Sequence, residues 1–450
     1  MSSTVATTRA RDEIRPLMKL AWPLIGNNLA IAAMNFADAV MAGRLGGKDL
    51  AAVAVGNSTW VLFFLAAMGV LMALSPLVSQ CFGAGLYDRI GSFLREGLKL
   101  ALIMAIAIVL ILQFGTAALM DWVGIDPEFR QMAVDYTRAI SWGAPAICCY
   151  LAIRFALEGI GFTRPILYFS LLALCVNIAG NFVFMYGYLG APAMGGVGCG
   201  VASAIAMWFM FISLLIYIYF SKRCEVLRLF QRHTSRLRHM KKEILQLGIP
   251  ISGNVAAEAG LFVAVSLLMG TLSANAAAAH QIALNYASTM FMVPLALASA
   301  ITVRVGHAIG AGESAIARRR GYVGIGLCGS FMTVSALVLL VFKDQIVGIY
   351  TTDPDVGALA VSLLFVAAIF QISDGVQVGV AGALRGFKDT RIPFVLNLFA
   401  YWVIGFTLAY GATNGASPSP QMVWAGFVFG LTVAAVLLLI RYRYLTRQLA

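Results

Sequence analysis

Long apolar runs alternate with short polar turns along almost all of this 450-residue chain. A helix that crosses a bilayer needs about 20 mainly apolar residues. Runs of that length are centred near residues 30, 63, 108, 143, 176, 208, 256, 290, 332, 369, 402 and 430. The pattern therefore predicts an all-α integral membrane protein with twelve transmembrane helices.

Two uncharged stretches, 165–221 and 392–440, are too long for one span each. Each is interrupted by a turn rich in Gly and Pro, at 187–196 and at 411–420. Because clusters of these residues mark turns, we predict a helical hairpin in each stretch.

The longest polar segment, 221–243, carries eight Lys and Arg residues. We predict that it is a cytoplasmic linker between an N-terminal six-helix lobe (1–220) and a C-terminal six-helix lobe (244–450). If both termini are cytoplasmic, 27 of the 32 Lys and Arg residues fall on the cytoplasmic side. Since cytoplasmic loops are enriched in Lys and Arg, this asymmetry predicts a multi-pass protein of the cytoplasmic (inner) membrane in that orientation.

The two predicted lobes repeat each other at an offset of 227 residues. Four pairs of segments match at this offset: LMKLAWP (17–23) with ILQLGIP (244–250), GAG (83–85) with GAG (310–312), Asp126-Pro127 with Asp353-Pro354, and LEGIGFTR (157–164) with LRGFKDTR (384–391). Four matches in order at one offset indicate an internal repeat. Because each repeat has an even number of spans, six, both lobes have the same orientation in the membrane. Such parallel repeats form two pseudo-symmetric bundles around a central path.

The composition narrows the class of protein. Only 12% of residues are charged, whereas a soluble domain has about a quarter. This excludes an ordinary cytosolic enzyme and a disordered chain. The net charge of +12 fits basic cytoplasmic loops, so we expect no nucleic-acid partner. The seven cysteines form no CxxC motif and the four histidines are scattered, so we expect no cofactor and no enzyme activity.

Three carboxylates, Asp38, Glu258 and Asp374, lie deep in otherwise uncharged spans. A charged side chain at mid-bilayer costs about 3 kcal/mol by insertion scales, so its presence needs a reason. One interpretation is structural, with hydroxyls or a distant basic residue holding each carboxylate. The other is a site that binds H⁺ or Na⁺ and exchanges it for a cationic substrate. None of the three aligns with another at the repeat offset, so the lobes share a scaffold but not a site.

Two further pairs of residues also have two interpretations each. Asn177 and Asn181 are four residues apart and therefore share a helix face, where they either join helices or orient a carboxylate. Pro23 and Pro250 are repeat-equivalent. A proline inside a helix frees a carbonyl and bends the helix, so each produces either a static kink or a functional bend.

Other charged residues have a simpler explanation. Asp135 with Arg138, and Arg154 with Glu158, have the spacing of pairs along one helix. The run Arg318–Arg320 is predicted to anchor the topology on the cytoplasmic side, with phosphate or lipid-headgroup binding as the alternative.

Seven segments together resemble the multidrug and toxic compound extrusion (MATE) transporters, specifically their NorM branch. They are PLIGNNLAIAAMNFADAVMAGRLG (23–46), AAVAVGNS (51–58), GAG (83–85), ALEGIGFTRPILY (156–168), AAAHQIALN (277–285), GHAIGAG (306–312) and ALRGFKDTRIP (383–393). The resemblance covers essentially the whole chain. It implies two six-helix bundles around a central V-shaped cavity, and export of amphipathic, often cationic, drugs and dyes in exchange for Na⁺ or H⁺.

The resemblance also implies a coupling site in the N-terminal lobe. Asp38 matches the family's aspartate in the first span, which couples transport to a proton or cation. Asn177 and Asn181 match its polar partners in the fifth span, with Tyr136 and Ser203 as further members. Asn181 stands where the DinF branch tends to have an aspartate, which favours the NorM branch.

In the C-terminal lobe the resemblance implies a second site. Glu258 and Asp374 match the acidic pair of the NorM branch, which makes them a candidate Na⁺ site. Gln281 and Asp353 match positions near the outward drug site. Phe291 stands where some relatives have a tyrosine, so its ring can still face a cation but the hydroxyl is lost.

We therefore expect a monomeric multidrug antiporter in the bilayer, with small amphipathic organic cations as substrates and Na⁺ or H⁺ as the coupling ion. One alternative is a lipid-linked oligosaccharide flippase of the same superfamily, although such chains carry cationic residues in the cavity. Another is a major-facilitator transporter, because AGLYDRIGSF (84–93) partly fits the loop motif of that class. Uptake of a zwitterionic nutrient is a further alternative on the same scaffold.

Overall fold

The computed structural model describes residues 10–229, 237–414 and 419–448, and every regular element in these ranges is helical. The first half comprises α1 (Ala10–Leu45), α2 (Gly47–Leu71), α3 (Leu74–Gly83), α4 (Tyr87–Val123), α5 (Pro127–Ser141), α6 (Ala144–Gly159), α7 (Arg164–Phe184), η1 (Tyr188–Gly190), α8 (Gly196–Phe220) and η2 (Lys222–Leu227). The second half comprises α9 (Leu237–Leu272), α10 (Ala274–Gly310), α11 (Ser314–Tyr350), α12 (Pro354–Gly386), α13 (Arg391–Leu398), η3 (Phe399–Phe406), α14 (Thr407–Thr413) and α15 (Pro420–Gln448).

Eleven helical segments in the described ranges are long and apolar enough to cross a membrane, and the pair α5–α6, bent by 46°, makes a twelfth. This confirms the predicted all-α membrane protein. The two long uncharged stretches are also divided as predicted. One contains α7 and α8, and the other contains α13 to α14 followed by α15.

The helices group into two compact units. The N-terminal unit contains Pro23–Phe82 and Leu86–Ser252. The C-terminal unit contains the described residues up to Trp22, then Gly83–Gly85 and everything from Gly253 onward. Both α1 and α9 therefore pass from one unit into the other within a single helix.

The predicted linker 221–243 is only partly outside helices. Its first residues form the 3₁₀ helix η2, in which Cys224 and Leu227 are buried. Its last residues, from Leu237, are already the first turns of α9. Residues 230–236 lie outside the described part of the chain. The division of the chain into six-helix lobes at 1–220 and 244–450 stays a prediction.

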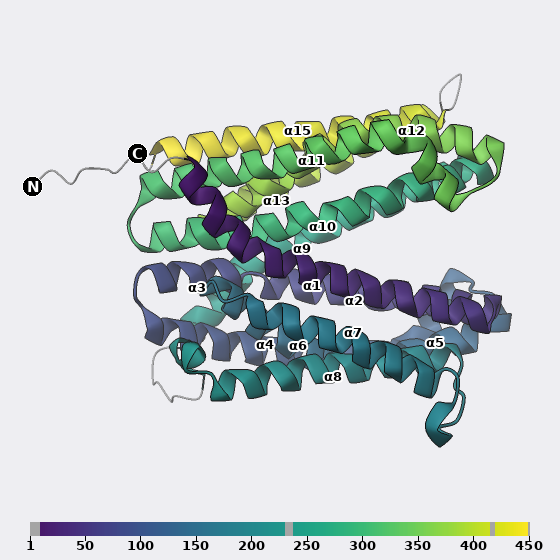
Figure 1. Ribbon diagram of the computed structural model, residues 1–450, viewed down its shortest axis with the longest axis horizontal. Helices are drawn as coiled ribbons and strands as arrows, with labels where there is room; N and C mark the ends of the chain where they lie inside the picture. Colours follow the sequence, from purple (N-terminus) through teal and green to yellow (C-terminus); the bar gives the residue numbers. More distant parts are fainter. Residues whose placement is uncertain (1–9, 230–236, 415–418, 449–450) are drawn as a thin grey trace, which may run out of the picture. The chain divides into compact units, whose positions relative to one another are not determined.

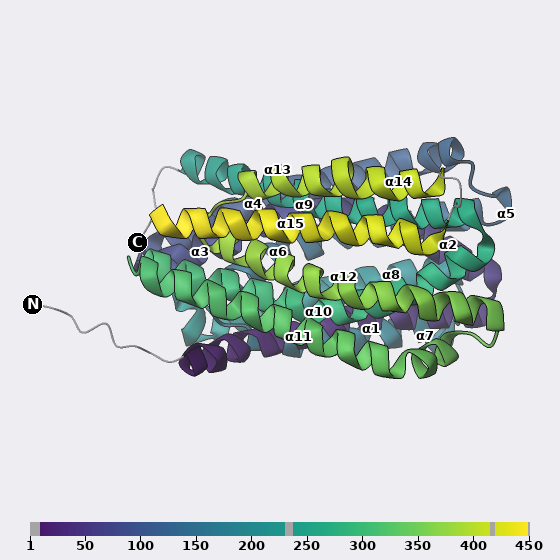
Figure 2. The same cartoon turned by 90° about the horizontal axis from the view of Figure 1, so that it is seen from above.

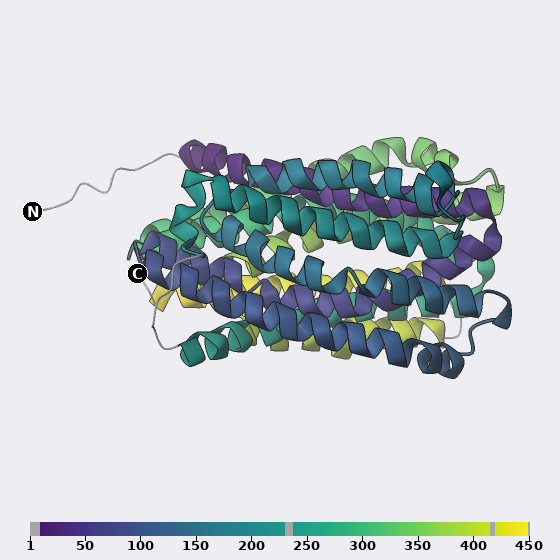
Figure 3. The same cartoon turned by 90° about the horizontal axis from the view of Figure 1, so that it is seen from below.

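In the N-terminal unit, α2, α5 and α8 are neighbours, and α4 packs on α6 (Figure 1). A small residue permits the close approach of α2 and α5. A Cβ on Gly56 would collide with the Tyr136 ring and meet the Thr137 hydroxyl at 3.0 Å. Hydrogen bonds to Asp38 join the purple helix α1 to the teal helices α7 and α8 (Figure 3).

In the C-terminal unit, α12 is central and packs against α10, α11 and α15 (Figure 2). The core contains stacked and edge-to-face aromatic rings. The ring centroids of the stacked pair Phe370 and Phe427 are 5.0 Å apart. The buried His280 joins three helices: Nδ1 accepts a hydrogen bond from Trp424 Nε1 at 3.1 Å, and Nε2 lies 2.8 Å from Ser266 Oγ. These contacts account for His280 as a residue of the packed core.

One of the two predicted intrahelical ion pairs is confirmed. Arg154 Nε and Glu158 Oε1 lie 2.8 Å apart on α6, and their side chains are 11% and 1% exposed. With its amide oriented to satisfy both partners, Asn27 on α1 accepts a hydrogen bond from Arg154 at 3.2 Å. The pair therefore also holds α1.

The other predicted ion pair, between Asp135 and Arg138, is wrong. The Arg138 side chain turns to the neighbouring helix α4, where Nε donates to the carbonyl oxygen of Gln113 at 3.1 Å. Asp135 accepts instead from Gln131 Nε2, also at 3.1 Å. Arg138 therefore forms a hydrogen bond to a carbonyl of another helix and no ion pair with Asp135 on its own helix.

Replacing Arg154 by Met is expected to lower the free energy of unfolding by about 3 to 5 kcal/mol, because Glu158 remains buried without its counter-charge. The double variant Arg154→Met with Glu158→Met is expected to recover most of that loss, since it removes both charges. Thermal unfolding of the purified protein in detergent measures both effects. Equal instability of the single and double variants would contradict this account of the pair.

Candidate functional site

Asp38 is the centre of a polar cluster in the N-terminal unit. The residue lies on α1 and is 8% exposed. Asn181 Nδ2 on α7 donates to Oδ1 at 2.6 Å, and Ser203 Oγ on α8 donates to Oδ2 at 3.1 Å. Both carboxylate oxygens are thus held by neutral donors from two other helices. In the described part of the chain, the groups that act on Asp38 are amides, a hydroxyl and a thiol, none of which is a cation.

The same cluster contains acceptor oxygens without donors. Asn177 Nδ2 donates to Ser203 Oγ at 3.2 Å, one helical turn before Asn181. Among the described residues, no donor reaches the buried Oδ1 of Asn177 or of Asn181. Burying an amide oxygen without a partner is costly. These oxygens therefore suit a cation or a protonated group near Asp38.

Tyr136 and Cys199 complete this cluster. The structure brings the predicted residue Tyr136 into electrostatic range of Asp38, with only 1% of the tyrosine exposed. The Cys199 thiol, one turn before Ser203 on α8, also interacts with Asp38. We did not predict Cys199, although its i,i+4 spacing from Ser203 places it on the same helix face.

Glu258 and Asp374 form a second cluster, in the C-terminal unit. Asp374 on α12 is 2% exposed, and Glu258 on α9 is half-buried. The negative charge of Glu258 acts on Asp374, and the positive charge of Arg385 acts on Glu258. Two carboxylates in an apolar site repel each other when both are ionised. A bound cation or proton relieves that repulsion.

Two buried glutamines, Gln371 and Gln377, lie three residues before and after Asp374 on α12. Gln377 Nε2 donates to Tyr401 Oη, and Ser335 Oγ donates to Gln371 Oε1 at 2.8 Å. Within the described ranges, the buried oxygens Asp374 Oδ1 and Gln377 Oε1 have no donor. Hard cations prefer oxygen ligands of this kind.

Tyr401 is the main residue of this cluster that we did not predict. It is fully buried in the π-helix η3 and lies in electrostatic range of Glu258 and Asp374. Trp402 Nε1 donates to the carbonyl of Ala257 at 3.1 Å, which holds η3 against α9 beside Glu258. Single π-turns occur frequently at functional sites.

Three predicted substrate residues lie apart from the acidic pair. Gln281 is exposed and Phe291 is half-buried, both on α10. Asp353 caps α12, because its Oδ1 accepts from two backbone N–H groups of the first turn at 2.9 and 3.3 Å. Asp126, its repeat equivalent, caps α5 in the same way. No hydrogen bond or ion pair in the described chain joins the three to the acidic pair, and their substrate role stays a prediction.

The two predicted helix-bending prolines lie where the chain passes between the units. Pro23 is the first residue of α1 in the N-terminal unit, and Pro250 lies three residues before α9 enters the C-terminal unit at Gly253. Both helices continue through their prolines. Each proline lacks an N–H and so leaves a carbonyl of the preceding turn unbonded.

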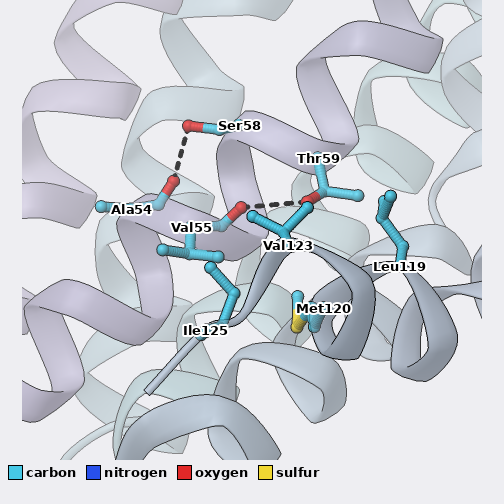
Figure 4. Close-up of a pocket in the computed structure, with 8 residues that line it drawn as sticks. All are labelled: Ala54, Val55, Ser58, Thr59, Leu119, Met120, Val123 and Ile125. Carbon is cyan, nitrogen blue, oxygen red and sulfur yellow. Dashed lines mark hydrogen bonds between the residues drawn. The ribbon is translucent and has the colours of Figure 1, made fainter.

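A cavity of about 350 Å³ lies in the N-terminal unit between α2 and α4 (Figure 4). Its lining is almost entirely apolar. The hydroxyls of Ser58 and Thr59 already donate to carbonyl oxygens of their own helix, at 2.8 and 3.1 Å. The cavity contains none of the predicted site residues and offers no charge, so it is not a cation site.

The chemistry of the two clusters points to a small hard cation or a proton. Across the residues that the structure describes, no group of three or more His, Cys, Asp and Glu side chains could hold a metal ion. Each cluster instead combines one or two carboxylates with neutral oxygens. Such a set fits an ion that binds and leaves in each transport cycle.

The fold and these clusters define a multi-pass membrane transporter. The sequence profile of the MatE family matches residues 23–183 and 250–411. The chain therefore belongs to the MatE family of transporters. The two matched segments lie in the two sequence repeats. This membership excludes the major-facilitator alternative.

Solved structures share the fold over nearly the full length of the chain. The eukaryotic MATE transporter AtDTX14 is 21% identical with a TM-score of 0.88, and the match covers 98% of each chain. An outward-facing multidrug resistance MATE transporter of the MOP superfamily is 20% identical over 98% of this chain and 99% of that chain, with a TM-score of 0.89.

A third match is a MOP superfamily transporter from Pyrococcus furiosus, described as having a binding pocket of reversed polarity that suggests a different function. It is 20% identical over 97% of this chain and 96% of that chain, with a TM-score of 0.87. At these identities the likeness shows the fold alone.

Proposed function

We propose that this protein exports amphipathic organic cations in exchange for Na⁺ or H⁺ that moves inward. The observation that carries the proposal is the pairing of buried carboxylates with buried acceptor oxygens that have no donor. This pairing occurs around Asp38 in one unit and around Asp374 in the other. A site of this kind attracts positive charge and is costly to leave uncompensated.

Exchange follows from competition for the same negative charge. When the carboxylates face the outside, they accept Na⁺ or H⁺, which weakens the binding of the organic cation and releases it. The ion-loaded protein then returns to the inward-facing state, where the ion leaves and a new substrate binds. The two binding equilibria are linked reciprocally, because each ligand lowers the affinity for the other.

The polarity of the site separates this proposal from the flippase alternative. A pyrophosphate-linked substrate needs cationic side chains in the cavity. Here Arg154 is already paired with Glu158, and the side chains around Asp38 are neutral. The similar transporter from Pyrococcus furiosus is described as having a binding pocket of reversed polarity that suggests a different function.

The distribution of Lys and Arg supports the proposed location. With 27 of 32 of these residues on the side of both termini, the positive-inside rule supports cytoplasmic termini and a location in the inner membrane. We propose that it acts as a monomer, since each cluster is built from the helices of one chain.

Proteoliposomes that contain the purified protein and a fluorescent cationic dye test this function. A Na⁺ gradient and a H⁺ gradient are imposed separately. We expect one of the two to drive dye movement against the ion flux. Dye movement driven by neither gradient would overturn the antiporter. A requirement for a polyprenyl-linked sugar would favour the flippase instead.

A further inference from the structure

Glu13 lies in the first turn of α1 and neutralises two arginines of the C-terminal unit. Its carboxylate accepts hydrogen bonds from Arg304 Nη2 on α10 and, at 3.2 Å, from Arg320 Nε on α11. Arg320 Nη1 also donates to the carbonyl of Arg304 at 3.2 Å. The three side chains are only 11%, 18% and 17% exposed. We call this group the Glu13 clamp.

Beyond the clamp, α1 is fastened to the other unit. After Trp22 the helix belongs to the N-terminal unit. There Asn27 accepts from Arg154, and Asp38 accepts from Asn181 and Ser203. Pro23 lies between the two fastenings, where the helix lacks one backbone hydrogen bond. Helix α1 is therefore held on both sides of its weakest point.

The clamp is not part of the scaffold that the two repeats share. At the offset of 227 residues, Glu13 corresponds to Met240, Arg304 to Leu77 and Arg320 to Phe93. Near the equivalent junction, α9 is held by a neutral contact, in which Ser252 Oγ donates to the carbonyl of Ala66 at 2.9 Å. The repeat-equivalent positions thus carry neither the carboxylate nor the two arginines.

We propose that Glu13 is a positioning residue for transport, an inference that rests on the proposed function. Movement of one unit against the other must bend α1 at Pro23, detach Glu13 from its arginines, or break the hydrogen bonds that hold α1 beyond Pro23. Detachment takes away the carboxylate that both largely buried guanidinium groups bind, which is strongly unfavourable. The clamp therefore directs the movement into a bend of α1, the helix that carries Asp38.

Pulsed electron paramagnetic resonance on the full-length protein in lipid nanodiscs tests this role. Spin labels are placed at Tyr87 and Ala315, which are exposed in the first turns of α4 and α11, one in each unit. The two cysteines that are not buried, Cys149 and Cys175, are replaced in all variants. We expect Glu13→Gln to shift or broaden the distance distribution between the labels. The maximal rate of dye export should fall several-fold, with little change in the dye concentration for half-maximal rate.

The matched control is Asp389→Asn. It breaks another largely buried ion pair, Asp389 with Arg441 at 2.7 Å, whose side chains are 12% and 21% exposed. That pair lies wholly in the C-terminal unit. We expect a loss of thermal stability comparable to that of Glu13→Gln, with an unchanged distance distribution.

Two further variants keep the inference falsifiable if Glu13→Gln does not fold. Arg320→Gln leaves the Glu13–Arg304 pair and is expected to give a smaller shift, whereas Glu13→Asp keeps the charge and is expected to restore most of the wild-type distribution. Wild-type distances in every clamp variant, despite lowered stability, would reduce the clamp to a structural ion pair and overturn the inference. The distances are measured without substrate, so a protein that exports no dye but shows the shift would overturn only the proposed function.

Discussion

Asp374→Asn and Glu258→Gln are each expected to reduce ion-driven dye export to the level of liposomes without protein. Each amide has nearly the size of the acid it replaces and can still accept hydrogen bonds. What it loses is the negative charge that binds the coupling ion and the organic cation in turn. Since two carboxylates share this site, removing either one leaves too little charge for exchange.

Export from proteoliposomes and growth of a pump-deficient host on a cationic drug measure this effect. Immunoblots of the membrane fraction show whether each variant is inserted. Asp121→Asn is the matched control, because Asp121 is 60% exposed in a surface pair with Arg130. Exposed pairs contribute about 1 kcal/mol or less, so this variant should export like the wild type. Retained export by both site variants would remove the acidic pair from the mechanism.

The second large effect is expected for Asp38→Asn, which should also abolish export while the fold is preserved. The new side chain can place its oxygen toward Asn181 and its amide group toward Ser203, whose hydroxyl can accept as well as donate. The hydrogen bonds of the cluster therefore survive, and only the charge is lost. Thermal unfolding close to that of the wild type, together with absent export, is the expected combination. Export at the wild-type rate would exclude Asp38 from coupling.

Asn181→Ala provides a graded test of the same cluster. It removes the donor 2.6 Å from Asp38, and a hydrogen bond to a charged group contributes about 1.5 to 3 kcal/mol. Without this donor the Asp38 carboxylate should hold a proton more tightly. In transport driven by a H⁺ gradient, the H⁺ concentration for half-maximal transport is then expected to fall by roughly ten- to hundred-fold. Asn414→Ala, in an exposed turn, is the control and should leave that concentration unchanged.

The spans and the repeat could be predicted because they depend on local sequence. Each span needs only enough consecutive apolar residues to cross the bilayer, and the Gly- and Pro-rich turns at 187–196 and 411–420 separate the hairpins. The cluster around Asp38 could also be predicted, because a carboxylate in an otherwise apolar span is easily recognised in the sequence. The i,i+4 spacing of Asn177 and Asn181 places both amides on the face of α7 that meets Ser203 and Asp38.

The remaining site residues depend on contacts that periodicity does not encode. Tyr401 lies in an uncharged apolar span, where a tyrosine resembles any other packing residue, and only the π-helix brings it beside the acidic pair. Arg385 lies in the last turn of α12 and acts on Glu258, an interaction that the sequence does not indicate. Arg138 satisfies a carbonyl of another helix in place of Asp135. The partners of these side chains depend on which helices pack together.

The central claim is that an ion and an organic cation exchange through shared negative charge, and reversing the driving force tests it most directly. A gradient of cationic dye is imposed across proteoliposomes that have equal ion concentrations and no membrane potential. Reciprocal coupling predicts that Na⁺ or H⁺ moves in the direction opposite to the dye, and that Asp374→Asn stops this ion movement. Dye movement without any ion movement, or ion movement in the same direction as the dye, would contradict the account.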